Sequence, residues 1–291
     1  MLFNQVTLIG AGLLGGSLGL ALQKHGLTKR VVAYVRRAGS VSEALSLKIA
    51  TAATQDLAEA VREADLVIIT TPIAQMKPLA ETLLPAMRSG AIVTDVGSVK
   101  ATVVEALEPM FATRGIHFVG SHPMAGGEKI GMAHARADLF ENAVSVITPT
   151  AATSPSALRS VDELWKGVGC NTLLMSPERH DDLVSRSSHL PHVVAAELAS
   201  YVLSPAHSKE QAQLCAGGFR DTTRVASGSP EMWRDICMAN QKNLTRVLGV
   251  FIESLQEFQH TLATGDAAGV EEFFHKAKER RDEWSQGQGG A

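Results

Sequence analysis

A histidine in a glycine-rich segment is the first candidate for chemistry in this chain. His122 lies within Gly120-Ser121-His122-Pro123, directly after the short apolar run His117–Val119. Imidazole titrates near neutral pH, so it can accept a proton from an alcohol while a hydride leaves the same carbon. The alternative is a structural histidine that caps a loop. We favour the catalytic interpretation because polar, glycine-rich segments follow neighbouring apolar runs as well.

The segment from Gln5 to Ala21 predicts a dinucleotide-binding loop. The apolar run Val6–Ile9 leads into Gly-Ala-Gly-Leu-Leu-Gly, with the G-x-G-x-x-G spacing, and then into a helix-like pattern. The first glycine permits a tight turn, the second lets a pyrophosphate approach the backbone, and the third lets the helix pack closely. Free N–H groups at the helix start favour a phosphate there. We therefore assign cofactor binding to Gly10, Gly12, Leu13, Leu14 and Gly15.

The residues after the second apolar run, Val31–Val35, bear on which dinucleotide binds. NAD-binding folds usually place an acidic residue here to bind the ribose 2′-hydroxyl. Arg36 and Arg37 follow instead. No carboxylate would repel a 2′-phosphate, and two guanidinium groups could bind it. We predict NADP as the cofactor, with NAD as the alternative. If Arg36 and Arg37 are only solvated residues of a loop, they do not decide between the two cofactors.

Two further apolar runs are followed by candidate cofactor ligands. Thr71-Pro72 comes after Leu66–Thr70, and Ser98 lies in the segment Asp95–Lys100 that follows Ala91–Thr94. The carboxyl ends of parallel strands meet at one edge of a sheet, where ligands bind. We therefore expect a single site at that edge, with Thr71, Pro72 and Ser98 contacting the cofactor.

These segments need a scaffold of alternating strands and helices. The apolar runs are Val6–Ile9, Val31–Val35, Leu66–Thr70, Ala91–Thr94, His117–Val119, Val144–Ile147 and Thr172–Met175. The helix-like segments between them are Glu43–Lys48, Asp56–Glu63, Met76–Met87, Lys100–Thr113 and Ser156–Gly167. The alternation predicts an α/β fold class, a Rossmann-like, doubly wound parallel sheet with helices on both faces, in an N-terminal domain of residues 1–175.

Residues 176–285 have a mostly helical pattern and predict an all-α substrate and dimerisation domain. Pro177–Leu203 contains Pro191, where we expect a kink. A loop is expected at residues 216–224, before a helix that starts at Ser229-Pro230 and runs to about Ala263. A last helix spans about Ala267–Trp284. Long helices alone make a thin core, so we expect a homodimer through this domain.

Composition excludes several other classes of protein. The chain has 291 residues, 45% of them hydrophobic and 20% charged, as in an ordinary globular protein. A net charge of −3 gives no electrostatic basis for binding nucleic acid or an anionic membrane. The apolar N-terminal stretch lacks the basic region of a signal peptide and is too polar for a membrane span. The three scattered cysteines favour a reducing, cytoplasmic location.

The ordered motifs of the chain resemble one enzyme family. The motifs are Gly10–Ser17, Asp95–Lys100, Gly120–Gly126, Ser188–His192 and Gly218–Arg224. Together they resemble the prephenate/arogenate dehydrogenases of tyrosine biosynthesis, over nearly the whole chain. The resemblance implies oxidative decarboxylation of a small-molecule substrate, a cyclohexadienol. Hydride leaves the carbon that bears the ring hydroxyl, carbon dioxide leaves the opposite carbon, and the ring becomes aromatic.

The resemblance also implies roles for individual residues. His122 resembles the histidine that hydrogen-bonds the ring hydroxyl and takes its proton, and Ser98 the serine that orients both. Arg224 resembles the arginine that binds a substrate carboxylate, a role that suits its bidentate fork. Matching substrate-binding positions are His180, His189, His192, Glu128, Asp221 and Trp233. For Trp233, a plain core role is the alternative.

A metal site, another type of NADP enzyme and a non-catalytic sensor are the alternatives to this interpretation. His189 and His192 have a spacing that a metal pair could use, but Pro191 distorts it and no third ligand is evident, so we expect no metal. A β-hydroxyacid dehydrogenase-like or imine reductase-like NADP enzyme is the runner-up; the former type needs a lysine in Pro177–Leu203, which contains none. A non-catalytic NADPH-binding sensor would not need the predicted catalytic residues together. The choice between prephenate and arogenate stays open.

Overall fold

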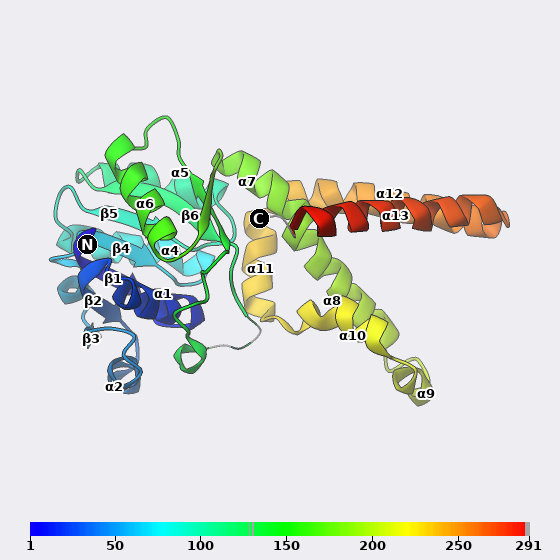
Figure 1. The fold of residues 1–291 in the computed structure, drawn as a ribbon, viewed down its shortest axis with the longest axis horizontal. Helices are drawn as coiled ribbons and strands as arrows, with labels where there is room; N and C mark the ends of the chain where they lie inside the picture. The colour runs from blue at the N-terminus through cyan, green and yellow to red at the C-terminus, as the bar shows by residue number, and fades with distance from the viewer. Residues whose placement is uncertain (128, 130, 289–291) are drawn as a thin grey trace. The chain divides into compact units, whose positions relative to one another are not determined.

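An eight-stranded sheet forms the centre of the first part of the chain. The computed structural model describes residues 1–127, 129 and 131–288. The strand order is β3-β2-β1-β4-β5-β6-β7-β8, and Figure 1 labels the strands from β1 to β6. The strands are β1 (Phe3–Ile9), β2 (Thr28–Tyr34), β3 (Ala52–Thr54), β4 (Leu66–Ile69), β5 (Ile92–Asp95), β6 (His117–Pro123), β7 (Val144–Thr148) and β8 (Asn171–Leu174).

The predicted parallel sheet is confirmed, with one antiparallel pair. Every neighbouring pair is parallel except β6 and β7, in which His122 lies opposite Val146. A parallel neighbour needs a crossover, usually a helix. The described residues between β6 and β7 contain only the short 3₁₀ turn η2 (Met132–His134), so β7 runs back beside β6. The carboxyl ends of β1, β4, β5 and β6 still share one edge.

Helices cover both faces of the sheet, as the alternation predicts. On one face lie α1 (Leu13–Lys24), α2 (Ala38–Ser46) and α6 (Pro155–Gly167); on the other lie α3 (Leu57–Val61), α4 (Ile73–Leu83), the turn η1 (Leu84–Ala86) and α5 (Ala101–Ala112). Successive strand residues point to opposite faces. Leu8 accordingly packs with Leu18 and Trp165, whereas Ile9 packs with Phe111 in the other core.

The helical segment after the sheet differs in three places from the sequence prediction. Its elements are α7 (Pro177–Val184), the π turn η3 (Ser185–His189), α8 (Leu190–Val202), α9 (Lys209–Gln213), α10 (Gly217–Thr223), the turn η4 (Arg224–Ser227) and α11 (Pro230–Ala239). The irregularity expected at Pro191 occurs just before it, as the π turn. Proline cannot donate to the preceding turn, and the wider turn accommodates that loss.

The prediction of a loop at residues 216–224 is wrong. The prediction of an unbroken helix from Ser229 is wrong as well. Residues 217–223 form α10, in which the hydroxyls of Thr222 and Thr223 bond to carbonyls four residues earlier and are satisfied within the helix. The later helix breaks at Asn240, whose φ of −112° and ψ of 27° are not helical. The side chain of Asn240 donates to the backbone carbonyl of Asp181 instead.

The chain divides into two compact units, residues 1–241 and 242–291. The second consists of α12 (Gln241–Ala263) and α13 (Ala267–Gln288), which pack as a helical hairpin through Phe258 and Phe273, with ring centroids 4.3 Å apart. The domain boundary expected between residues 175 and 176 stays a prediction. Among the described residues, every helix is too short or too polar to cross a membrane.

Candidate active site

The glycine loop joins β1 to α1 in a geometry that only glycine permits. Gly10 has a φ of +105°, which L side chains rarely adopt. A Cβ on Gly15 would lie 2.4 Å from the backbone oxygen of Gly10, so the helix packs on the strand only without a side chain there. Gly12 has no atom within 4 Å of its would-be Cβ, so its backbone is open to a close approach. These positions fit a dinucleotide pyrophosphate.

Thr71 and Pro72 follow β4 at the same edge of the sheet. The hydroxyl of Thr71 is buried and has no hydrogen-bond partner among the described residues. Buried polar groups are nearly always paired, so this hydroxyl suits contact with a ligand. Thr70 donates to the backbone oxygen of Gly10 at 2.9 Å and ties this segment to the glycine loop. Both predicted residues therefore lie beside the loop that would hold the cofactor.

Arg36 and Arg37 lie beyond the carboxyl end of β2, as predicted, and both are exposed. Gln55 donates to the backbone oxygen of Arg36 at 2.9 Å, and Arg37 is the N-cap residue that precedes α2. The backbone is thus anchored while both guanidinium groups face solvent. This placement fits the binding of a ribose 2′-phosphate.

His122 lies at the carboxyl end of β6 and is held by a second histidine. Its ring is 8% exposed, and its Nδ1 is 2.9 Å from Nε2 of His180 on α7. The two rings meet edge to face. Nδ1 of His180 is in turn 2.8 Å from Oδ1 of Asp181. Within the described residues Nε2 of His122 makes no hydrogen bond, so this nitrogen is the one left for a ligand.

The surroundings of His122 keep its imidazole neutral. Burial, followed by the electrostatic influence of His180, Lys100 and His189, holds the pKa of His122 well below its ordinary value of 6.5. Burial disfavours the charged form of a base, and the ammonium of Lys100 adds to that effect. At neutral pH the ring is therefore unprotonated and able to accept a proton.

A buried ion pair fixes the strand end that carries His122. Lys100 and Asp95 are both inaccessible to solvent, and the ammonium of Lys100 bonds to Oδ2 of Asp95 and to the backbone oxygen of Ser121. The backbone N–H of Ser121 donates to Asp95 Oδ1 at 3.1 Å, and its hydroxyl donates to the Asp95 carbonyl at 2.6 Å. The residue before His122 is therefore anchored from several sides.

His189 is a buried hydrogen-bond donor in the same region. Nδ2 of Asn240 lies 3.2 Å from Nδ1 of His189, so that ring nitrogen accepts. Burial lowers the pKa of His189 to about 4, while Asp181 and the backbone of Ser98 act to raise it. The neutral ring therefore carries its proton on Nε2, which is buried without a hydrogen-bond partner among the described residues. This donor suits a ligand that presents an oxygen.

His192 and Trp233 wall a groove in the helical segment. Their ring centroids are 3.9 Å apart, and Trp233 also meets His189 edge to face at 6.1 Å. The groove has a volume of about 480 Å³ and lies between α8 and the segment from η4 to α11. Trp233 is half-buried, so it is a lining residue rather than a plain core residue.

The remaining predicted site residues differ in their exposure to solvent. Ser98 is half-buried in the segment between β5 and α5, and its hydroxyl makes no hydrogen bond within the described residues; His180, not Ser98, holds His122. Arg224 and Asp221 are exposed on η4 and α10. Glu128 lies outside the described residues. Among those residues, no group of three or more His, Cys, Asp or Glu side chains could hold a metal ion.

Sequence reasoning missed Asp181, Asn240 and Lys100. Asp181 is 2% exposed and Asn240 is 3% exposed, whereas Lys100 is fully buried. A buried lysine needs a paired acid, and the i to i+5 spacing of Asp95 and Lys100 in a polar segment was an available signal. Asp181 adjoins Asp182, and nothing in the sequence indicates which of these two acids is buried at the site.

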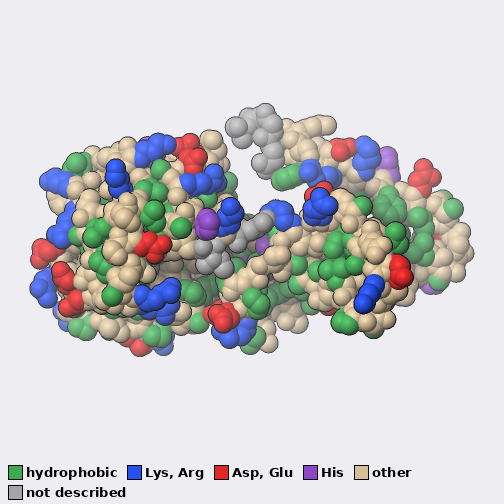
Figure 2. Space-filling model, turned by 90° about the horizontal axis from the view of Figure 1, so that it is seen from below, with side chains coloured by type: hydrophobic (Ala, Val, Ile, Leu, Met, Phe, Trp, Pro, Cys, Tyr) green, Lys and Arg blue, Asp and Glu red, His purple; other side chains and the backbone are tan. Residues whose placement is uncertain are grey.

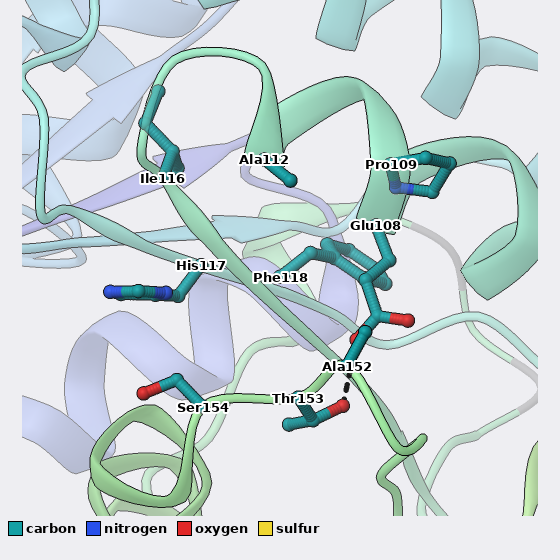
Figure 3. A pocket seen from close by; sticks show the side chains of 9 residues that line it. All are labelled: Glu108, Pro109, Ala112, Ile116, His117, Phe118, Ala152, Thr153 and Ser154. Carbon is teal, nitrogen blue, oxygen red and sulfur yellow. Dashed lines mark hydrogen bonds between the residues drawn. The ribbon is translucent and has the colours of Figure 1, made fainter.

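A second, smaller pocket contains none of the predicted residues (Figure 3). Its wall includes Ile116 and His117, at the amino end of β6. Glu108 accepts hydrogen bonds from the hydroxyls of Thr150 and Thr153, each at 2.7 Å, and is satisfied by them. The pocket lies at the opposite end of β6 from His122, away from the edge where ligands bind such sheets.

Comparison with known proteins gives a consistent family. Residues 18–174 match the nucleotide-binding domain of prephenate dehydrogenase, and residues 176–276 match its dimerization domain. The chain is 37% identical to a prephenate dehydrogenase of Bacillus subtilis, covering 96% of this chain and 76% of that protein. It is 34% identical to a cyclohexadienyl dehydrogenase of Zymomonas mobilis, covering 96% and 95%.

A solved structure also resembles this chain along nearly its full length. Prephenate dehydrogenase from Aquifex aeolicus, in complex with hydroxyphenyl propionate and NAD+, superposes with a TM-score of 0.90 at 32% sequence identity. The match covers 96% of this chain and 98% of that one. Both halves of the chain, sheet and helices, therefore have counterparts in a single known protein.

Proposed function

The chain belongs to the prephenate dehydrogenase family, and we propose that it catalyses the oxidative decarboxylation of a cyclohexadienol, prephenate or arogenate. The products are 4-hydroxyphenylpyruvate or tyrosine. The observation that carries the proposal is His122, a neutral imidazole at the carboxyl end of β6 whose Nδ1 is held by His180. The proposed domains are residues 1–175 and 176–285, supported by family matches that change over between residues 174 and 176.

The proposed reaction uses His122 as the proton acceptor. Nε2 of His122 takes the ring hydroxyl proton as the hydride leaves the same carbon. When bound, the oxidised nicotinamide ring accepts that hydride. The electrons of the bond to the departing carboxylate enter the ring, which becomes aromatic as carbon dioxide leaves. His122 then returns the proton to the phenol oxygen, so no proton is gained or lost overall.

The cofactor that we propose is NADP. The glycine loop and Thr71 would hold the pyrophosphate at the start of α1. Arg36 and Arg37 support NADP, because they offer guanidinium groups where NAD-binding folds usually have an acid. The Aquifex aeolicus relative was solved with NAD+, so NAD is the alternative.

Substrate recognition is proposed to combine the groove with charged side chains. His192 and Trp233 line a groove of a size usual for small ligands, and the Nε2–H of His189 is an unpaired donor among the described residues. Arg224 is proposed to bind the side-chain carboxylate, since a tight clamp on the ring carboxylate would oppose its departure. Supporting roles are proposed for Ser98, His180, Glu128 and Asp221.

We also propose a homodimer in the cytoplasm. The match to a dimerization domain supports self-association, as do Ile252, Leu255 and Leu262, which are exposed on α12. On the face drawn in Figure 2, hydrophobic side chains gather over the helical part of the chain. Cys170, Cys215 and Cys237 are all free thiols, which suits a reducing compartment.

The test is turnover of prephenate and arogenate with NADP and with NAD, for wild type and His122→Asn. The variant should bind cofactor normally and lose about 10²–10⁴-fold in turnover, the usual contribution of general acid–base catalysis. His117→Asn is the matched control, because His117 lies at the far end of the same strand. Wild type that turns over neither substrate would overturn the proposed reaction, and an active His122→Asn would remove His122 from it.

A further inference from the structure

We propose that Asp181 is a positioning residue that fixes which nitrogen of His122 carries the proton. The inference rests on the proposed function, in which Nε2 of His122 accepts the substrate proton. In the contacts that the structure gives, the Asp181 carboxylate bonds to His180, and His180 bonds to His122, so Asp181 acts through His180.

Asp181 is held at the start of α5 by backbone donors. Its Oδ1 accepts from the backbone N–H of Lys100 at 2.7 Å, and its Oδ2 accepts from that of Ala101 at 2.9 Å. Backbone N–H groups can only donate, so both oxygens of Asp181 are acceptors. The start of a helix also favours a negative charge. The side chain is 2% exposed, so water does not compete for these contacts.

The acceptor role of Asp181 propagates through two rings. Because Oδ1 is an acceptor 2.8 Å from Nδ1 of His180, that nitrogen carries a proton. In the arrangement that we propose, Nε2 of His180 is the acceptor, and it lies 2.9 Å from Nδ1 of His122. Nδ1 of His122 therefore carries the proton. The lone pair of His122 is left on Nε2, where a substrate hydroxyl can reach it.

The neighbouring acid provides a matched control. Asp182 follows on the same helix, is only partly buried, and pairs with the guanidinium groups of Arg179 and Arg186. It has the same chemistry as Asp181, but it is partly exposed and pairs with arginines. A role that belongs to Asp181 specifically should therefore be absent at Asp182.

The kinetic arm compares Asp181→Asn with Asp182→Asn. An asparagine side chain has one oxygen and one NH₂ group. It therefore either turns its NH₂ group toward a backbone N–H donor or stops accepting a hydrogen bond from His180. Asp181→Asn should lower turnover by about 10²–10⁴-fold, the range for a disabled general base, with cofactor affinity and the substrate Michaelis constant unchanged. Asp182→Asn should match wild type. Equal turnover in Asp181→Asn and wild type would overturn the proposal.

The spectroscopic arm reads the tautomer itself. Imidazole ¹⁵N resonances distinguish a protonated from an unprotonated ring nitrogen, and His122→Asn identifies the signals of His122. Wild type should show a protonated Nδ1 and an unprotonated Nε2 at neutral pH, and Asp181→Asn should show a mixture. A proton on Nε2 of wild-type His122 would overturn the proposal, even if Asp181→Asn fails to fold. So would a variant that loses turnover yet keeps the wild-type tautomer.

The two proposals fail in distinguishable ways. If wild type turns over neither prephenate nor arogenate, the proposed reaction is wrong, while the ¹⁵N spectrum still reports whether Asp181 sets the tautomer of His122. If wild type is active but His122 carries its proton on Nε2, the reaction stands and the positioning role of Asp181 does not.

Discussion

At the scale of single residues, neighbouring side chains of the same type make different contacts. Asp181 accepts two backbone N–H groups and a histidine, whereas Asp182 pairs with arginines near the surface. The catalytic role of His122 can be predicted from the sequence, because the apolar run before it and the glycines around it are visible in the sequence itself. It cannot single out Asp181, because the start of α5, eighty residues earlier, becomes its neighbour only in the fold.

The depressed pKa of His122 predicts an unusual pH profile. A group that must be unprotonated loses activity as pH falls through its pKa, and burial holds the pKa of His122 well below 6.5. The ratio kcat/KM should therefore stay level from neutral pH down through 6.5 and fall only in more acidic solution. Steady-state rates across that range, with cofactor saturating, measure it. An acidic limb centred at or above 6.5 would contradict the neutral, buried ring.

Arg36 and Arg37 should decide cofactor preference. A charge-assisted contact is worth roughly 1.5–3 kcal/mol, or about tenfold or more, so replacing both with alanine should raise the Michaelis constant for NADP by about a hundredfold or more. That for NAD should change little. Lys29→Ala is the control, because Lys29 is an exposed cation at the other end of β2. A wild type that already prefers NAD would show that these arginines have another role.

At the scale of elements, strand ends were predictable and helix interruptions were not. Glycine and polar residues after apolar runs located the carboxyl edge of the sheet correctly. The reversal of β7, the helix α10 and the break at Asn240 were missed. The reversal of β7 follows a connection that contains no long helix among its described residues, and the hydroxyls of α10 are satisfied within that helix. The break at Asn240 depends on a tertiary partner, because the side chain of Asn240 bonds to the backbone of Asp181.

Gly12 and Gly15 should separate binding from folding. Gly15→Ala places a methyl group 2.4 Å from a backbone oxygen, so the thermal unfolding temperature should drop and cofactor binding should weaken with it. Gly12→Ala meets no protein atom within 4 Å, so the protein should stay stable while cofactor affinity falls. Thermal unfolding and fluorescence titration with NADPH measure both. Full NADPH affinity in Gly12→Ala would place the pyrophosphate elsewhere.

At the scale of the whole molecule, the second compact unit is too thin to bury its own apolar surface. Ile252, Leu255 and Leu262 are 45%, 47% and 55% exposed and recur at helical spacing along α12. Sedimentation at micromolar concentration should report a dimer. Ile252→Glu with Leu255→Glu should shift it toward monomer, and Glu253→Gln should not. A wild-type monomer would mean that this stripe has no protein partner.

The π turn at residues 185–189 makes the length of its segment more important than its composition. An α-helix turns by about 100° per residue, and a π turn already holds one residue more than an α turn, so inserting a further residue there would rotate all of α8 by about that angle. His192 would then leave the ring of Trp233, on which it stacks. Exchanges at the exposed Arg186 and Ser187 would leave the register intact. Insertions, rather than substitutions, are thus the genetic changes that this stretch of the protein can least tolerate.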